Sequence, residues 1–335
     1  MSRDDEPTTR KCGTPELHQR LLQLREYQAN QLLLEMYTNK FTRVAGSLRL
    51  VNSFDIPVVV HVVYQTDEQN VAEQQVQSQI EVLNRDYMAM NNDRGSVPPP
   101  WTSLVGSAGV QFHLASADPL GNPTDGITRT QTSRPSFGVD ESVKSAATGG
   151  ADPWPADRYL NIWTCNLAGG LLGYAQFPGG PATTDGVVIR YSAFGSGGST
   201  DAPFDLGRTT THEVGHWLNL RHIWGDVIGC GGDDYVDDTP PAESPNYGAP
   251  TFPHVTCNNG PNGDMFMNFM DYVDDDVMCF FTVGQVARMQ AVFAGPRSSF
   301  ATPPATARSG RFLNWVSTQS TQVPPQWLGW SAEFE

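Results

Sequence analysis

The chain has 335 residues, 39% of them hydrophobic, enough for one large domain or two modest ones with a real core. Its 36 acidic and 21 basic residues give a net charge of −15, which argues against a nucleic-acid partner because such a partner needs a basic surface. No apolar run is long enough to span a membrane, and the start MSRDDEPTTR lacks the apolar segment of a signal peptide, although a trimmed leader leaves export open.

The predicted elements alternate between helices and strands. Leucines at helical spacing after Thr14 and Pro15 predict an amphipathic helix over residues 16–40. The β-branched run IPVVVHVVYQ predicts a strand, and a helix is predicted over about residues 71–92. Three more strands are predicted at VQFHLAS, YLNIWTC and GVVIRY. A helix should begin near Asp205 or Thr209, and a last one should cover about residues 282–293 after a loop-rich stretch.

The stretch TTHEVGHWLNLRH, residues 210–222, carries a metal-binding pattern. His212 and His216 are four residues apart, so on a helix both imidazoles face one side and can share one ion. Glu213 lies beside that ion, where a carboxylate can act as general base and acid. His222 can be a third ligand only if the helix stops, and Asn219 tolerates the left-handed backbone that a stop requires. Three ligands leave a fourth position for water, as in catalytic zinc sites.

Two alternatives remain beside a zinc peptidase. The ion could be structural in a catalytically inactive zinc-binding protein, or the enzyme could be a metallohydrolase that acts on something other than peptide. Glu213 beside three ligands weighs against the first alternative, and a peptide-cleavage assay distinguishes the second.

HEVGHWLNLRH resembles the metzincin motif HExxHxxGxxH, with Asn219 in place of the glycine. MNFMDYVDDD resembles the methionine turn of that group. This resemblance implies that Met270 forms a floor beneath the metal and that Tyr272 hydrogen-bonds the developing oxyanion. Together with LNIWTCNL, LLGYAQFPGG and DGVVI, the pattern is similar to the pappalysin family and its ulilysin-like members over about residues 50–294.

The resemblance implies an α+β metzincin fold over residues 46–295. An upper subdomain, to about residue 218, would hold a twisted mixed sheet with its backing and active-site helices. A lower, irregular subdomain, residues 219–295, would end in a helix. Extended peptide would bind between them along an edge strand that includes Leu172 to Gln176. Residues 296–335 are rich in Pro, Ser and Thr and are interpreted as a tail.

RKCGTPE, residues 10–16, resembles the latency segment of this family. Arg10 and Lys11 would favour the thiolate of Cys12, and a thiolate is a good zinc ligand. The family's proforms contain a similar RxCGT segment, which implies that residues 1–45 are a propeptide whose Cys12 caps the zinc until cleavage within TNKFTRVAGSLRLVNS. The alternative is an incidental cysteine in a disordered tail.

Three further expectations come from the resemblance. Asp234, Asp238 and Thr239, in an aspartate-rich loop suited to hard oxygen-binding cations, would bind a structural Ca²⁺, the alternative being a solvated acidic turn. Cys230 and Cys257 would form a disulfide. Asp275 would select Arg or Lys after the scissile bond, unless it is only a surface-turn residue or a calcium ligand.

These expectations together describe a zinc endopeptidase made as a latent zymogen. Its partners would be peptide and protein substrates and its own propeptide, with no nucleic acid and no membrane. We expect the mature enzyme to be a monomer. A disulfide and a calcium ion both suit an extracellular location.

Overall fold

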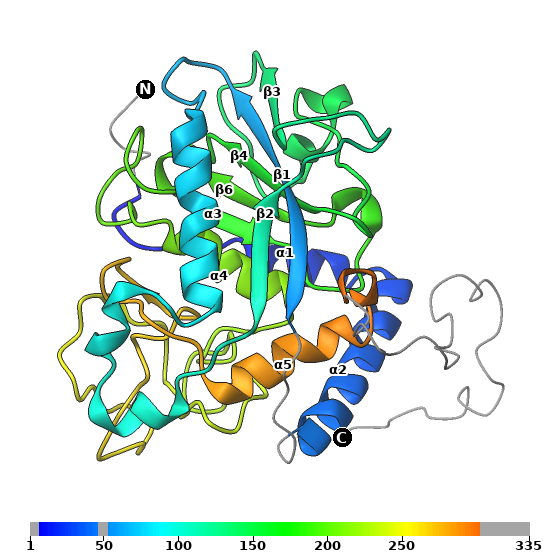
Figure 1. The fold of residues 1–335 in the computed structure, drawn as a ribbon. Coiled ribbons are helices and arrows are strands. Elements are labelled where there is room, and N and C mark those ends of the chain that lie inside the picture. The colour runs from blue at the N-terminus through cyan, green and yellow to red at the C-terminus, as the bar shows by residue number, and fades with distance from the viewer. Residues whose placement is uncertain (1–6, 46–52, 302–335) are drawn as a thin grey trace, which may run out of the picture. The chain divides into compact units, whose positions relative to one another are not determined.

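A computed structural model describes residues 7–45 and 53–301 (Figure 1). Most of the tail expected at 296–335 and part of the proposed cleavage region lie outside these residues. The helices are α1 (Thr14–Leu21), α2 (Arg25–Ala45), α3 (Glu73–Tyr87), α4 (Arg208–Trp217) and α5 (Val283–Phe293). The strands are β1 (Phe54–Tyr64), β2 (Val110–Leu114), β3 (Ile127–Gln131), β4 (Leu160–Cys165), β5 (Gly173–Ala175), β6 (Val187–Arg190), β7 (Tyr247–Gly248) and β8 (Tyr272–Val273).

One mixed sheet organises the upper part of the chain. Its order is β2-β1-β4-β6-β5, with β3 also pairing to β1, and every pair is parallel except β5 with β6. The β-branched run of β1 is buried on both sides: Val58 and Val60 pack with α3 and α4, whereas Val63 packs with Trp163 on the opposite face. Burial on both faces is why this strand is an unbroken apolar run. This architecture confirms the α+β expectation.

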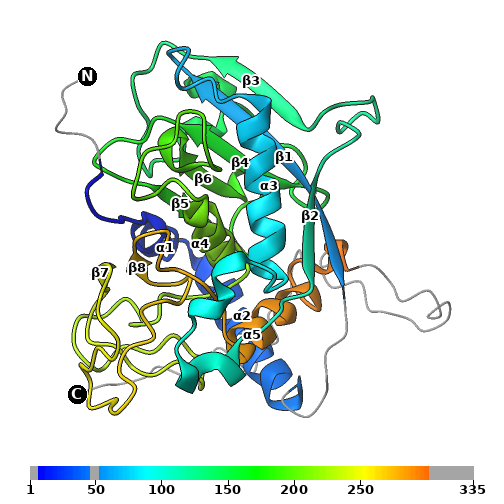
Figure 2. The same ribbon diagram turned by 60° about the vertical axis from the view of Figure 1, so that its left-hand side comes forward.

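Helices α3 and α4 cover the same face of the sheet (Figures 1 and 2). Buried Val76, Ile80, Leu83 and Tyr87 recur at helical spacing and fix α3 against the core. The Tyr87 hydroxyl donates to the carbonyl of Thr211 at 2.9 Å. Helix α3 therefore braces the helix that carries the histidines.

The lower part is mostly irregular, as expected. Between α4 and α5, the pair β7–β8 is the only strand pair among the described residues. The expected disulfide between Cys230 and Cys257 is present. Helix α5 begins with a capping box. The Thr282 hydroxyl accepts a hydrogen bond from the backbone amide of Gln285, and the Gln285 side-chain oxygen accepts one from the backbone amide of Thr282.

The N-terminal prediction was wrong in one respect: the single helix expected over residues 16–40 is two helices. The chain turns at Leu22–Leu24, because α1 packs on β5 while α2 packs on α5. The edge strand expected within Leu172–Gln176 is β5, the last strand of the sheet. Within residues 7–45 and 53–301, no helix combines the length and apolar character needed to cross a bilayer.

Candidate active site

Helix α4 and the turn after it position the histidines. The helix follows Gly207, which has φ of 78°, and ends before Asn219, which has φ of 74°. This is the left-handed conformation that the sequence predicts for Asn219. The amide of Leu220 then donates back to the carbonyl of Gly215 at 2.9 Å. The reversal brings His222 to the histidines of α4.

The three Nε2 atoms of His212, His216 and His222 lie 3.1–3.2 Å from one another. Each ring is oriented by a bond from its other nitrogen. Nδ1 of His212 faces the carbonyl of Phe269 at 2.7 Å, and Nδ1 of His216 faces that of Leu220 at 2.7 Å. Nδ1 of His222 faces a carboxylate oxygen of Asp226 at 2.5 Å. These outer partners place the protons on Nδ1, so the Nε2 lone pairs converge.

Converging lone pairs fit a divalent cation. Burial lowers the pKa values of His212 and His216 well below their ordinary range, so these rings are neutral donors. The Sγ atom of Cys12 completes a group of four donor atoms that all lie within 4.8 Å of one another. A set of three imidazoles and one thiol is the chemistry that zinc prefers.

Glu213 lies beside this group and is fully enclosed. Its Oε2 accepts hydrogen bonds from the Thr14 hydroxyl at 2.9 Å and from the Cys12 thiol at 3.4 Å. Burial raises its pKa to about 7. A Cβ atom at Gly173 of β5 would meet Cγ of Glu213 at 2.8 Å, so the strand packs directly on this side chain. Sequence reasoning missed Thr14, although its place two residues after Cys12 in RKCGTPE was a usable signal.

The expectation that Arg10 and Lys11 favour the thiolate of Cys12 was wrong. Arg10 and Lys11 do not face the thiol: Arg10 reaches Asp275, and Lys11 Nζ donates to the carbonyl of Gly169 at 3.1 Å. Burial, followed by the charge of Glu213, raises the pKa of Cys12 well above its ordinary value. The flanking cations therefore do not favour the thiolate, and a metal ion at the three imidazoles would have to do so.

Met270 and Tyr272 both border the histidine group. Met270 is fully buried under α4, where a Cβ atom at Gly215 would meet its sulfur at 2.5 Å. The ring of Tyr272 packs against those of His222 at 4.9 Å and His212 at 5.8 Å, between centroids. Its hydroxyl is hydrogen-bonded by the backbone of Cys12. The segment expected to form a methionine turn therefore lies beside the three histidines.

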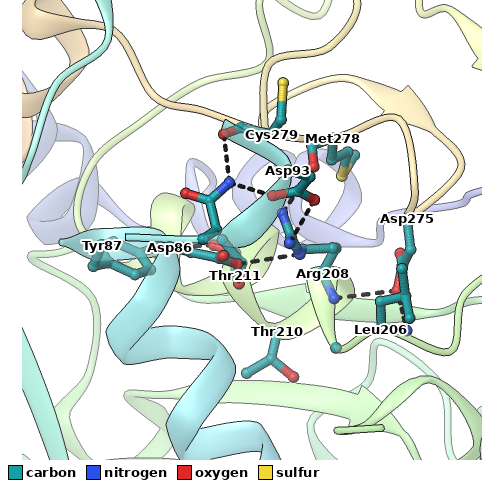
Figure 3. Close-up of polar contacts among 12 residues, drawn as sticks. Asp86, Tyr87, Asp93, Leu206, Arg208, Thr210, Thr211, Asp275, Met278 and Cys279 are labelled. Carbon is teal, nitrogen blue, oxygen red and sulfur yellow. Dashed lines mark hydrogen bonds and ion pairs between the residues drawn. The ribbon is translucent and has the colours of Figure 1, made fainter. Parts of the chain in front are cut away.

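Asp275 is not a surface-turn residue, because its side chain is completely buried. Its Oδ2 accepts from the amides of Leu206 at 2.8 Å and Arg208 at 3.2 Å (Figure 3), and these bonds fix the carboxylate. Its Oδ1 accepts from Arg10 Nη2 at 2.5 Å.

Three other groups surround the Arg10 guanidinium. Nη1 donates to the Thr209 hydroxyl at 2.9 Å, Nε donates to the carbonyl of Val273 at 3.1 Å, and the Phe204 ring lies 5.0 Å from Cζ. We call Asp275, Thr209, Val273 and Phe204 the arginine site. No sequence signal pointed to Thr209 or Phe204, because the fold alone brings them to Asp275.

The three residues expected to bind calcium do not converge. Thr239 Oγ1 lies 2.8 Å from Asp234 Oδ2 and 2.7 Å from the carbonyl of Val236. The carboxylate of Asp238 points elsewhere, to the Thr282 hydroxyl at 2.6 Å and the amide of Gly284 at 2.8 Å, where it caps α5. Only Asp234 and Thr239 therefore share one site.

Comparisons with known proteins relate this chain to metalloproteases. Residues 145–294 match the peptidase M43 family model, described as pregnancy-associated plasma protein-A. Extracellular metalloprotease 1 of Coccidioides posadasii is 34% identical over 67% of this chain and 70% of its own length. An extracellular metalloprotease of Pyricularia oryzae is 31% identical over 85% of this chain and 88% of its own length.

Two solved structures from Tannerella forsythia are also similar. Mature mirolysin of Tannerella forsythia, in complex with a cleaved peptide, is 50% identical, with a TM-score of 0.73 over 74% of this chain and 96% of its own. A promirolysin mutant from the same organism is 44% identical, with a TM-score of 0.81 over 87% of this chain and 97% of its own.

Proposed function

Since this chain belongs to the pappalysin family of metalloendopeptidases, we propose that it is a latent zinc endopeptidase that cleaves before arginine and, less well, before lysine. The observation that carries the proposal is the convergence of three Nε2 atoms beside the enclosed carboxylate of Glu213. The extracellular relatives support secretion. We expect the mature form to be a monomer.

His212, His216 and His222 would hold the zinc ion. A zinc ion there supplies Lewis acidity to the attacking water and to the scissile carbonyl. Glu213 accepts the proton of that water and later donates it to the leaving amine. Its position beside the three imidazoles lets one carboxyl group perform both transfers. The Tyr272 hydroxyl, relieved of the Cys12 backbone, donates to the oxyanion.

The arginine site supports the substrate preference. Asp275 offers one oxygen to a guanidinium while two backbone amides hold the other. Thr209 and the carbonyl of Val273 accept from two further nitrogens. An ammonium group is a single point charge and cannot reach all three acceptors, which is why arginine should be preferred to lysine.

Residues 10–14 would maintain latency by occupying the substrate's place. The amide of Leu172 donates to the carbonyl of Lys11 at 3.0 Å, and the amide of Gly13 donates to that of Gly173 at 2.8 Å, so the segment runs parallel to β5. In this segment the arginine precedes the residue at the metal, whereas in the proposed substrate it follows the scissile bond. A substrate must therefore run in the opposite direction, antiparallel to β5.

Residues 1–45 would accordingly be a propeptide, residues 46–295 the catalytic domain and residues 296–335 a tail. Residues 297–300 pack on α4 all the same: the Arg297 side chain donates to the carbonyl of Trp217 at 2.9 Å, and Phe300 contacts the Trp217 ring. A tail that detaches would have to begin after Phe300.

The test uses the mature protein and a peptide with one internal arginine. Cleavage should occur before that arginine and should stop with phenanthroline. Glu213→Gln should reduce kcat by about 10²–10⁴-fold, since it removes the general base. The variant should retain one zinc per chain by elemental analysis, because the imidazoles are unchanged. A folded wild-type protein that retains no zinc, or a fully active Glu213→Gln variant, would refute the mechanism.

We also propose a structural Ca²⁺ at Asp234, Thr239 and the carbonyl of Val236. Burial raises the pKa of Asp234 to about 7, an unfavourable environment for a carboxylate that a bound cation would relieve. A calcium-selective chelator should lower the melting temperature, and Ca²⁺ but not Zn²⁺ should restore it. Asp234→Asn should remove that response, whereas the exposed Asp233→Asn should retain it. A melting temperature unaffected by the chelator would exclude the site.

A further inference from the structure

Helix α2 covers two arginines of the catalytic part. Glu35 of α2 accepts from Arg288 through both carboxylate oxygens, at 2.9 Å from Nη1 and 2.5 Å from Nη2. Nη2 of Arg221 lies 3.8 Å from the same carboxylate. The Arg288 side chain is only 1% exposed and that of Arg221 is 19% exposed. Two cations from different segments thus face one carboxylate.

Contacts within the catalytic part hold both arginines without α2. Nε of Arg288 donates to the carbonyl of Asn219 at 2.6 Å. Both guanidinium groups lie on the ring of Tyr235, with Cζ of Arg221 at 5.0 Å and Cζ of Arg288 at 5.5 Å from its centroid. Arg221 also lies 5.8 Å from the ring of Phe177. We call Arg221 and Arg288 the carboxylate site, because contacts other than that with Glu35 also orient both side chains.

Nearby acids do not replace Glu35. Asp226 is bonded to His222 Nδ1, and Asp234 is bonded to the Thr239 hydroxyl. Among the described residues, Nε of Arg221 has no hydrogen-bond partner at all. Removal of α2 would therefore take away the Glu35 carboxylate, the one ion-pair partner that Arg221 and Arg288 have among the described residues, while the charges of Asp226 and Asp234 act on them without an ion pair.

The carboxylate site lies at the far end of β5 from the arginine site. Phe177 follows β5 and contacts the ring of His216 at 5.4 Å between centroids. Segment 10–14 begins beside Leu172, at the opposite end of the strand. Since a substrate would run antiparallel to β5 with its arginine at the Leu172 end, the residues near Phe177 and Arg221 would precede the scissile bond.

We propose that Arg221 and Arg288 form a second specificity site of the mature enzyme, which binds an acidic side chain located a few residues before the scissile bond. This inference rests on the proposed function and deepens it. Glu35 occupies the position of that side chain in the latent form. A planar guanidinium binds a carboxylate through two parallel hydrogen bonds and cannot do so with a neutral amide. The enzyme would thus select an acidic residue before the scissile bond and a basic residue after it.

The experiment uses mature enzyme and peptides with a fixed arginine after the scissile bond. Glu or Gln is placed at each preceding position in turn, and kcat/KM is measured for every pair. We expect a Glu-over-Gln preference of about fivefold to tenfold at one position, as for a charge-assisted contact. Arg221→Gln and Arg288→Gln should each bring that ratio close to one. Arg158→Gln, which alters an exposed arginine that also contacts an aromatic ring, should leave the ratio intact.

Each outcome has a defined meaning. Equal cleavage of the Glu and Gln peptides at every position would overturn the inference, as would a preference that survives both variants. If a variant fails to fold or to retain zinc, the wild-type enzyme is measured at increasing ionic strength instead. The Glu-over-Gln ratio of kcat/KM should then decrease, because salt screens a charge contact. A ratio that does not depend on salt would contradict the inference. Cleavage elsewhere than before arginine would instead refute the proposed function.

Discussion

Two residues of the N-terminal segment, Arg10 and Glu35, form ion pairs with the catalytic part, and their charges are opposite. At Arg10–Asp275 the segment supplies the cation, and both side chains are almost fully buried, at 1% and 0% exposure. At Glu35–Arg288 the segment supplies the anion, which is 19% exposed. Each segment residue occupies a place that, by our proposals, belongs to a substrate side chain.

The two pairs differ in what surrounds them. Arg10 is followed at once by Cys12 and Thr14, which contact Glu213. Glu35 belongs to a helix that touches α5 and the turn at Asn219, where Nδ2 of the Asn219 side chain donates to the Thr38 hydroxyl at 3.4 Å. Loss of the first pair would free the catalytic residues, whereas loss of the second would only loosen a helix. We infer that residues 10–14 enforce latency and that α2 anchors them.

The largest effect should come from Arg10→Gln in the full chain. The substitution leaves Asp275 buried without its cation, which costs about 2–5 kcal/mol of docking free energy. We expect the variant to activate itself at least about tenfold faster, since each 1.4 kcal/mol is a factor of ten in an equilibrium. Mass spectrometry over time would follow conversion, with Cys12→Ser as the reference for a lost metal contact.

Lys11→Gln is the matched control, because Lys11 is exposed and donates only to a loop carbonyl. It should convert at the wild-type rate. If Arg10→Gln stayed as latent as the parent, the Arg10–Asp275 pair would not enforce latency. Latency would then have to be attributed to α2.

The sequence predicted best where chemistry depends on local spacing. The motif from His212 to His222 specifies a helix, a left-handed stop at Asn219 and a third imidazole, and the structure has all three. Strands β1, β4 and β6 were also predictable, because parallel strands buried on both faces are rich in apolar residues. The short, polar and half-exposed β3 gave no such signal.

Prediction failed where distant segments decide the outcome. The charges beside Cys12 suggested a thiolate, but tertiary contacts direct Arg10 to Asp275, 265 residues away. Asp238 was predicted to share a site with Asp234, but it caps α5. Glu35 pairs with Arg288 across 253 residues, and no local sequence pattern predicts this contact. Composition shows which groups exist, while the fold decides which of them meet.

The smaller effect should come from Glu35→Gln. This pair is partly exposed, so its loss should cost about 1 kcal/mol of docking free energy and speed conversion only a few-fold. Added salt should speed wild-type conversion slightly, and Glu35→Gln should lack this response because the screened charge is gone. Glu26→Gln, an exposed acid on the same helix, should behave like wild type. If Glu35→Gln converted as fast as Arg10→Gln, α2 would share in enforcing latency, and the two anchors would have to be treated as one cooperative unit.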